Sequence, residues 1–172
     1  MKINYDFSKN NYAGKTGDVT LRDLARLCDV FYIGGTKCGA LFGEAVVIPN
    51  PDLIPHFFTI IKQHGALLAK GRIAGIQFLT LFTDGLYLRI GQHALEMAAY
   101  LKTELHRKHI PFFYEPPTNQ LFIILPAQTI NALSGQVDFC FWEKYGDTHS
   151  VVRLATSWAT EKEDINRLLS LL

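Results

Sequence analysis

The chain carries few charges and almost no imbalance between them. Of its 172 residues 19% are charged, with 17 Lys and Arg against 16 Asp and Glu, so the formal net charge is +1. The chain has no basic surface stripe that could bind a nucleic-acid phosphate backbone, and it has too few charges for a charged, disordered tail. Because the chain lacks such a basic surface, nucleic acid is a poor candidate partner. With 48% apolar residues, the chain is long enough to bury the core of one or two globular domains.

Cysteine and long hydrophobic runs are also scarce. The three cysteines are an odd number without a Cys-x-x-Cys pair, which argues against a disulfide framework or a thiolate metal site and for a reducing compartment. The longest apolar runs, 40–48 and 79–88, are interrupted by Glu44 and Asp84 and are too short to span a bilayer. The first residues have no apolar signal region. We therefore expect a cytoplasmic protein with no membrane partner and no metal.

Apolar periodicity predicts a series of elements up to residue 109. Thr20 and Asp23 have the spacing of a capping box, which indicates a short helix to about Cys28. The elements expected after it are a strand at 29–33, a loop around Lys37, a strand at 44–48, a core-facing helix at 53–64 started by Asp52, and a long, bent or broken helix at 71–109.

A different pattern begins after Pro111, which ends the long helix. Short strands are expected at 112–114, 120–125, 137–141 and 150–156, with a helix at 129–134 and a turn at 146–147. Thr160 and Glu163 have the spacing of a second capping box, opening a closing helix with Ile165 and Leu169 on its apolar side. The composition shift near Ile110 marks the boundary of a compact α+β unit.

A lone lysine, Lys37, lies among small and apolar residues directly after a predicted strand, in the segment 34–44. Desolvation in such a setting disfavours the ammonium form, so the neutral amine would become available to a carbonyl. Lys37 is therefore a Schiff-base candidate. The other interpretation is a glycine-rich turn with a surface lysine reaching water. Composition and spacing leave both open.

Three segments carry a resemblance to one enzyme family. They read DVFYIGGTKCGALFGEA at 29–45, KGRIAGIQF at 70–78 and VVRLATS at 151–157. Here the chain resembles the threonine aldolases and related β-eliminating lyases, which use pyridoxal phosphate (PLP). The likeness extends from about Asp18 to the C-terminus.

The resemblance implies an α/β fold of the aspartate-aminotransferase type, of which only the C-terminal part is represented. Residues 1–70 would be a remnant of the large PLP-binding domain, containing the strand, the lysine loop and the second strand. Residues 71–110 would be a long linking helix, and residues 111–172 a small C-terminal α+β domain.

The family also implies roles for particular residues. Lys37 matches the lysine that carries PLP, with Thr36 beside it, and Arg72 matches a position used near the cofactor phosphate. Upstream, Asp6 could pair with the pyridine nitrogen and Lys9 could replace a family arginine, although their spacing to Lys37 is about two residues shorter than in the family. The segment around Asp6 could equally be unrelated sequence.

Arg153 is a candidate on its own residues as well. It lies inside an apolar strand on the same face as Val151 and Ala155, where an arginine is costly unless an anion meets it. A substrate carboxylate bound by both arms of the guanidinium would suffice. The alternative is an edge-strand arginine with its head in water. The family places its substrate-carboxylate arginine at the matching position.

Three other patterns do not indicate a site. The segment 14–16, Gly-Lys-Thr, lacks the first glycine of a P-loop because Lys9 stands five positions before it. Cys38 has no histidine nearby in the sequence, and His106 and His109 lack the companions of a zinc site. We interpret these features as a solvated turn, a small buried thiol and helix-end solvation.

The resemblance implies a PLP-dependent lyase that cleaves a β-hydroxy amino acid to glycine and an aldehyde. Family members are about twice as long, and their N-terminal half supplies the group stacking on PLP, the phosphate-binding turn and a catalytic histidine. We therefore expect this truncated chain to be inactive alone and to form a homo-oligomer or to need an N-terminal complementing chain. The alternative is a non-catalytic remnant or an interaction subunit of a split PLP enzyme.

Overall fold

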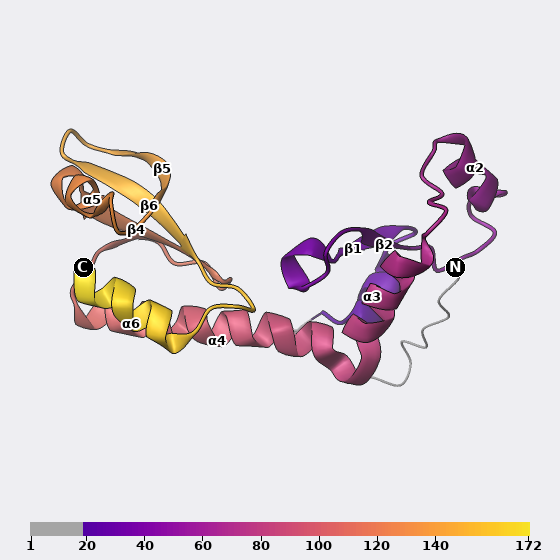
Figure 1. Cartoon of the computed structure of the whole chain (residues 1–172), viewed down its shortest axis with the longest axis horizontal. Helices are drawn as coiled ribbons and strands as arrows, with labels where there is room; N and C mark the ends of the chain where they lie inside the picture. The colour runs from indigo at the N-terminus through magenta and orange to yellow at the C-terminus, as the bar shows by residue number, and fades with distance from the viewer. Residues whose placement is uncertain (1–18) are drawn as a thin grey trace. The chain divides into compact units, whose positions relative to one another are not determined.

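The computed structural model describes residues 19–172, which form two compact units that divide between Ile90 and Gly91 (Figure 1). The predictions for Asp6, Lys9 and the segment 14–16 lie outside the described residues. Both units combine helices with antiparallel strands, which confirms the mixed α/β class. In the described part of the chain, no helix has the length and apolarity needed to cross a membrane.

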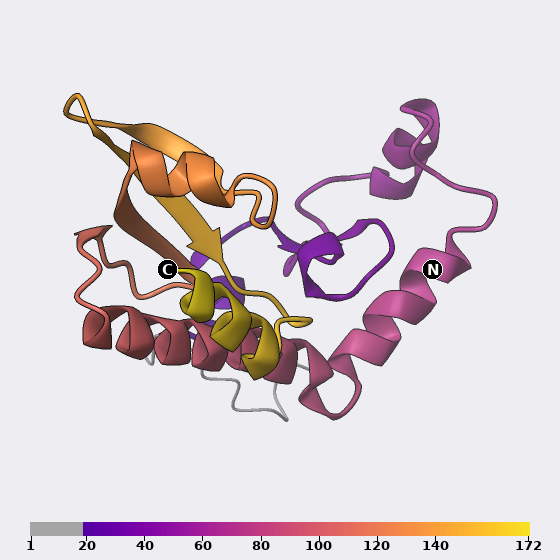
Figure 2. The same cartoon turned by 60° about the vertical axis from the view of Figure 1, so that its left-hand side comes forward.

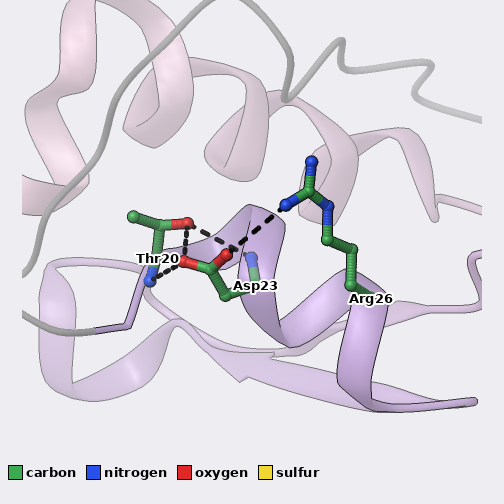
Figure 3. Close-up of polar contacts among 3 residues, drawn as sticks. All are labelled: Thr20, Asp23 and Arg26. Carbon is green, nitrogen blue, oxygen red and sulfur yellow. Dashed lines mark hydrogen bonds and ion pairs between the residues drawn. The ribbon is translucent and has the colours of Figure 1, made fainter.

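Within the described residues, the first helix of the first unit is α1 (Leu21–Leu27), which begins at the expected capping box (Figure 3). The Asp23 amide donates to Thr20 Oγ1 at 3.2 Å, and the Thr20 amide donates to Asp23 Oδ2 at 2.9 Å. Hydrogen bonds from the Thr20 hydroxyl and amide lower the pKa of the Asp23 carboxyl. Arg26 lies one turn further along, 3.9 Å from Asp23. This prediction from local spacing is confirmed.

Two strands follow, joined by the loop that carries Lys37. Strands β1 (Phe31–Gly34) and β2 (Glu44–Val47) pair antiparallel, with Ile33 opposite Ala45. Between them lies a short 3-10 helix, η2 (Thr36–Cys38). The predicted strand-loop-strand order is confirmed. Ile33 is buried against Phe78 and Phe82 of helix α3 (Arg72–Phe82), and these three residues form the core of this unit.

Helix α2 (Phe57–Gln63) begins later than predicted. The expectation of a start near Asp52 is wrong because Pro55 disfavours helical dihedrals at Ile54, and His56 has a left-handed φ of 57°. The helix therefore begins only after these residues.

The predicted long helix is broken, as expected, into α3 (Arg72–Phe82), the 3-10 turn η3 (Thr83–Gly85) and α4 (Leu86–Arg107). Asp84 and Gly85 both have positive φ, at 50° and 69°, which no α-helix accommodates. Thr83 Oγ1 donates to the Leu79 carbonyl at 2.7 Å, and Arg89 Nη1 donates to the Asp84 carbonyl across the break.

The second unit contains a four-stranded antiparallel sheet in the order β3-β4-β6-β5. Its strands are β3 (Phe112–Tyr114), β4 (Gln120–Pro126), β5 (Cys140–Tyr145) and β6 (His149–Ala155). Helix α5 (Ala127–Leu133) follows β4, and α6 (Lys162–Leu171) closes the chain.

Alternate residues of the central strands form the core of this unit. Ile123 on β4 and Val152 on β6 are buried against Leu105 of α4 and Leu169 of α6. Helix α6 lies beside α4 under the sheet (Figure 2). On the other side of the strands Phe122, Ile124 and Val151 form a smaller cluster. The period-2 alternation of strand side chains separates these two faces.

Two details differ from the sequence expectations. Strand β5 begins at Cys140 rather than at Val137, because the Val137 amide donates to the Leu133 carbonyl and closes α5 instead. The second capping box is shifted by one residue, to Glu161 and Asp164. The Thr160 hydroxyl instead accepts a hydrogen bond from the Ser157 amide at 2.9 Å.

Candidate active site

Lys37 is the middle residue of η2, directly after β1. One carbonyl, that of Gly35, closes the turn. It accepts hydrogen bonds from the amides of Cys38 and Ala40, at 2.9 and 3.0 Å. Gly39 ends the turn with a φ of 91°, a conformation that glycine adopts at no steric cost. The chain therefore presents Lys37 on a tight, locally hydrogen-bonded turn.

Gly35 is enclosed by the surrounding chain. A Cβ at this position would lie 2.8 Å from Phe78 Cζ, 2.9 Å from Ala40 Cβ and 3.0 Å from the Gly43 carbonyl oxygen. The two carbon distances are shorter than real Cβ contacts, so a side chain at Gly35 would force its neighbours to shift. The close approach of α3 to the turn thus accounts for a glycine two residues before Lys37.

Helix α3 also holds the far side of the loop. Gln77 Oε1 accepts a hydrogen bond from the Leu41 amide at 2.6 Å, and Gln77 Nε2 donates to the Ile73 carbonyl at 3.4 Å. Arg72 is the first residue of this helix and is exposed. Lys37, Thr36 and Arg72 therefore all belong to the first unit, with α3 packed against the loop.

Tyr87, in the first turn of α4, contacts the Lys37 turn as well. Its hydroxyl donates to the Gly34 carbonyl at 3.0 Å. Burial raises the pKa of the Tyr87 hydroxyl well above its usual range, and the neighbouring Cys38 thiol raises it further. The phenol therefore stays protonated and remains a hydrogen-bond donor at neutral pH.

The Lys37 side chain itself is exposed, as is Thr36. Residues 19–172 provide no side-chain hydrogen bond or ion pair to Lys37, and they do not supply the desolvation that its sequence setting suggested. An unpaired amine on a turn held by hydrogen bonds and close packing fits covalent attachment of PLP. Asp6, the proposed partner of the pyridine nitrogen, lies outside the described residues.

Arg153 lies on β6 in the second unit, opposite Phe122 of β4 and Cys140 of β5. Strand β6 runs between β4 and β5, so the edge-strand alternative is wrong. The guanidinium has two weak contacts, from Nη1 to Gln120 Oε1 at 3.5 Å and from Nη2 to Cys140 Sγ at 3.4 Å. Its Nε is buried without a hydrogen-bond partner among the residues that the structure describes.

That orphaned donor fits an anion-binding role. A buried N–H group without a partner costs free energy, and a carboxylate would satisfy it with a charge-assisted hydrogen bond. No acidic side chain of residues 19–172 forms an ion pair with Arg153. The half-buried guanidinium therefore retains capacity for a carboxylate from outside this part of the chain.

A buried threonine just after β6 anchors the end of this strand by hydrogen bonds. Thr156 Oγ1 donates to the Ala94 carbonyl of α4 at 2.6 Å. Asn119 holds the same residue from the other side, since its Nδ2 donates to the Thr156 carbonyl at 2.6 Å and its carbonyl accepts from the Thr156 amide at 3.0 Å. These bonds fix the strand that carries Arg153 three residues earlier.

Sequence reasoning missed several of these residues. Gln77, Tyr87 and Asn119 belong to no recognisable spacing, because each bonds to backbone far away in the sequence. Thr156 was visible only as part of the segment 151–157.

The histidine interpretation needs a correction. His106 does have a carboxylate companion, because Glu115 lies 3.4 Å from His106 Nε2 and 2.6 Å from Lys102 Nζ. The hydrogen bond from Lys102, with a smaller effect of His106, lowers the pKa of Glu115. No group of three metal-binding side chains occurs among the described residues. The cluster is therefore an ion-pair network between α4 and the segment after β3.

Comparisons with known proteins show which proteins the chain is similar to. No family model matches the chain. A low specificity L-threonine aldolase of Pseudomonas aeruginosa is 30% identical over 142 residues, which cover 81% of this chain and 40% of that protein. One from a Pseudomonas species is 28% identical over 141 residues, with the same coverage. The matched proteins are aldolases.

A solved structure of Leishmania major threonine aldolase is similar to this chain with a TM-score of 0.82 and 44% sequence identity. The match covers 90% of this chain and 45% of that one. The resemblance to the C-terminal portion of the threonine aldolases is therefore confirmed. The chain spans about two fifths of the length of the curated relatives it matches.

Proposed function

We propose that this chain is the C-terminal part of a cytoplasmic, PLP-dependent lyase of the threonine aldolase type. The reaction would cleave a β-hydroxy amino acid between Cα and Cβ, giving glycine and an aldehyde. The observation that carries the proposal is Lys37, an exposed amine on a glycine-supported turn directly after β1. The 44% identity to a solved threonine aldolase supports the same assignment.

Each proposed site residue has a distinct role. Lys37 Nζ holds PLP, Thr36 lies beside it, and Arg72 binds the cofactor phosphate, with Asp6 as the partner of the pyridine nitrogen. When bound, PLP withdraws electrons from the substrate bond that breaks. Arg153 binds the substrate carboxylate through its guanidinium and so orients the amino acid. The half-buried position and the orphaned Nε support this role.

The chain would be inactive alone and would act with a second copy or with an N-terminal complementing chain. It covers only 40% of its curated relatives. Within residues 19–172 the β1–β2 sheet has two strands, so the outer edge of each lacks a partner strand there. Tyr32 and Val46, opposite each other on this sheet, are 69% and 56% exposed. Such edges and apolar side chains are typical of a surface covered by another chain.

The test maps the lysine that captures PLP. The chain is co-expressed with the N-terminal part of the Leishmania relative, incubated with PLP, reduced with borohydride and digested for peptide mapping. We expect the label on Lys37 and a loss of the visible cofactor absorbance in Lys37→Ala. Lys62→Ala is the matched control, since Lys62 is another exposed lysine of the first unit. An undiminished absorbance in Lys37→Ala would contradict the assignment.

A second candidate function is a non-catalytic interaction subunit of a split PLP enzyme. The exposed apolar residues of the β1–β2 sheet favour it, because they fit a binding partner whether or not chemistry occurs. The complemented protein separates the two functions. Production of glycine and acetaldehyde from threonine supports the lyase, whereas a stable complex without turnover supports the interaction subunit.

A further inference from the structure

Tyr87 contacts both ends of the segment that carries Lys37. Its hydroxyl donates to the carbonyl of Gly34, the last residue of β1, at 3.0 Å. The same hydroxyl lies beside the thiol of Cys38, the last residue of η2. One phenol oxygen therefore spans the turn in which Lys37 is placed.

The ring of Tyr87 is itself anchored. It packs on Phe82 with a centroid distance of 5.4 Å and belongs to the hydrophobic cluster of Ile33, Phe78 and Phe82. Tyr87 is also the second residue of α4, two positions after Gly85 at the break between α3 and α4. The ring thus fixes the hydroxyl relative to the core of the first unit, while the hydroxyl fixes the turn.

We propose that Tyr87 is a positioning residue for Lys37, acting through the Gly34 carbonyl and the Cys38 thiol. Tyr87 does not touch the reacting atoms. Its hydroxyl limits the movement of the turn, so that the Lys37 amine is presented from a single backbone conformation. The importance of this role for cofactor capture rests on the proposed function, whereas the restraint on the turn does not.

Tyr87→Phe is the appropriate perturbation because it removes the hydroxyl and keeps the ring. One hydrogen bond is worth about a 2- to 12-fold change in an equilibrium constant. We expect the variant to fold, to open the turn more often by this factor, and to leave the packing against Phe82 intact. Tyr100→Phe is the matched control: Tyr100 lies on the same helix, and its hydroxyl donates to Asn166 Oδ1 at 2.7 Å in the second unit.

The first readout is independent of PLP. Iodoacetamide labels the free cysteines, and peptide mapping gives the rate at Cys38 relative to that at the exposed Cys140. We expect this ratio to rise about 2- to 12-fold in Tyr87→Phe and to stay unchanged in Tyr100→Phe. An unchanged ratio in a folded Tyr87→Phe protein would overturn the proposal.

The second readout is PLP capture at Lys37 relative to Lys62 in the complemented protein, measured by borohydride reduction. A fall in Tyr87→Phe alone supports the positioning role, and no fall despite a higher Cys38 ratio overturns it. If the unsubstituted protein shows no capture at Lys37, the proposed function fails while the restraint on the turn is still measured by the first readout.

If Tyr87→Phe does not fold, a measurement on the unsubstituted protein still tests the proposal. A restrained turn predicts slow hydrogen exchange at the Cys38 and Ala40 amides, which both donate to Gly35. Exchange of these amides at the rate of an open chain would overturn the proposal.

Discussion

Substituting Gly35 by alanine tests whether close packing fixes the Lys37 turn. The new Cβ would lie 2.8 Å from Phe78 Cζ, 2.9 Å from Ala40 Cβ and 3.0 Å from the Gly43 carbonyl oxygen. Carbon atoms attract each other best at roughly 3.5–4.0 Å, so each carbon contact is too short by well over half an ångström. The three neighbours include a backbone atom, and they belong to helix α3 and to the loop between η2 and β2. No single side-chain movement relieves all three contacts, and overpacking of this kind costs about 1–3 kcal/mol.

Gly34→Ala is the matched control on the adjacent residue. A Cβ at Gly34 meets nothing within 4 Å. Both tryptophans, Trp142 and Trp158, lie in the second unit, so their fluorescence reports that unit alone. The first unit is followed by hydrogen exchange of the peptide 31–47. We expect roughly 5- to 150-fold faster exchange of this peptide in Gly35→Ala, which corresponds to the destabilisation of about 1–3 kcal/mol given above.

The controls sharpen this expectation. The urea transition seen by tryptophan fluorescence should not move in Gly35→Ala, because the substitution lies in the other unit. Gly34→Ala should exchange like the unsubstituted chain. If Gly35→Ala and Gly34→Ala exchange within about a factor of two of each other, the reasoning from close contacts at Gly35 is refuted.

Three further outcomes are expected. In the complemented protein Arg153→Lys should raise KM and lower kcat/KM about tenfold or more while PLP uptake is kept, because lysine retains the charge but loses the two-armed geometry; unchanged kinetics would count against carboxylate binding. Size-exclusion chromatography and light scattering across a dilution series should show the isolated chain to be a dimer or larger, whereas a cooperative, concentration-independent monomer would mean that the β1–β2 edges are covered within the chain. Since the folded-state pKa of Glu115 is lowered, its contribution to stability is present above its unfolded pKa and is lost as the pH falls through the folded value. Glu115→Gln should therefore flatten the acid loss of stability followed by tryptophan fluorescence, and an identical pH profile would contradict this.

Several elements could be predicted because their causes are local. The Thr20 and Asp23 pair is three residues apart, and its hydrogen bonds need only the first turn of α1. The alternation in β4 and β6 was likewise readable, because one face of each strand meets α4 and α6. The glycines and apolar residues around Lys37 indicated a loop between two strands, and the resemblance to the threonine aldolases then gave the lysine a chemistry.

Other features depended on which elements pack together. Tyr87 bonds to a carbonyl 53 residues earlier, and Gln77 bonds to an amide 36 residues earlier. Periodicity in a sequence reports which face of an element is apolar, but it does not report which distant backbone group that face will meet. The same limit explains the Glu115 ion pairs and the interior position of the strand that carries Arg153.

The sequence by itself determined the kinds of elements, their order and the lysine-bearing loop, since these follow from spacing, capping and glycine content. Only the tertiary structure determined the lack of space for a side chain at Gly35, the hydrogen bond from Tyr87 to the Gly34 carbonyl, and the position of Arg153 in its sheet. The physical reason is that these properties belong to contacts between segments. Steric exclusion and hydrogen bonding over long sequence separations exist only after α3, α4 and the strands have packed.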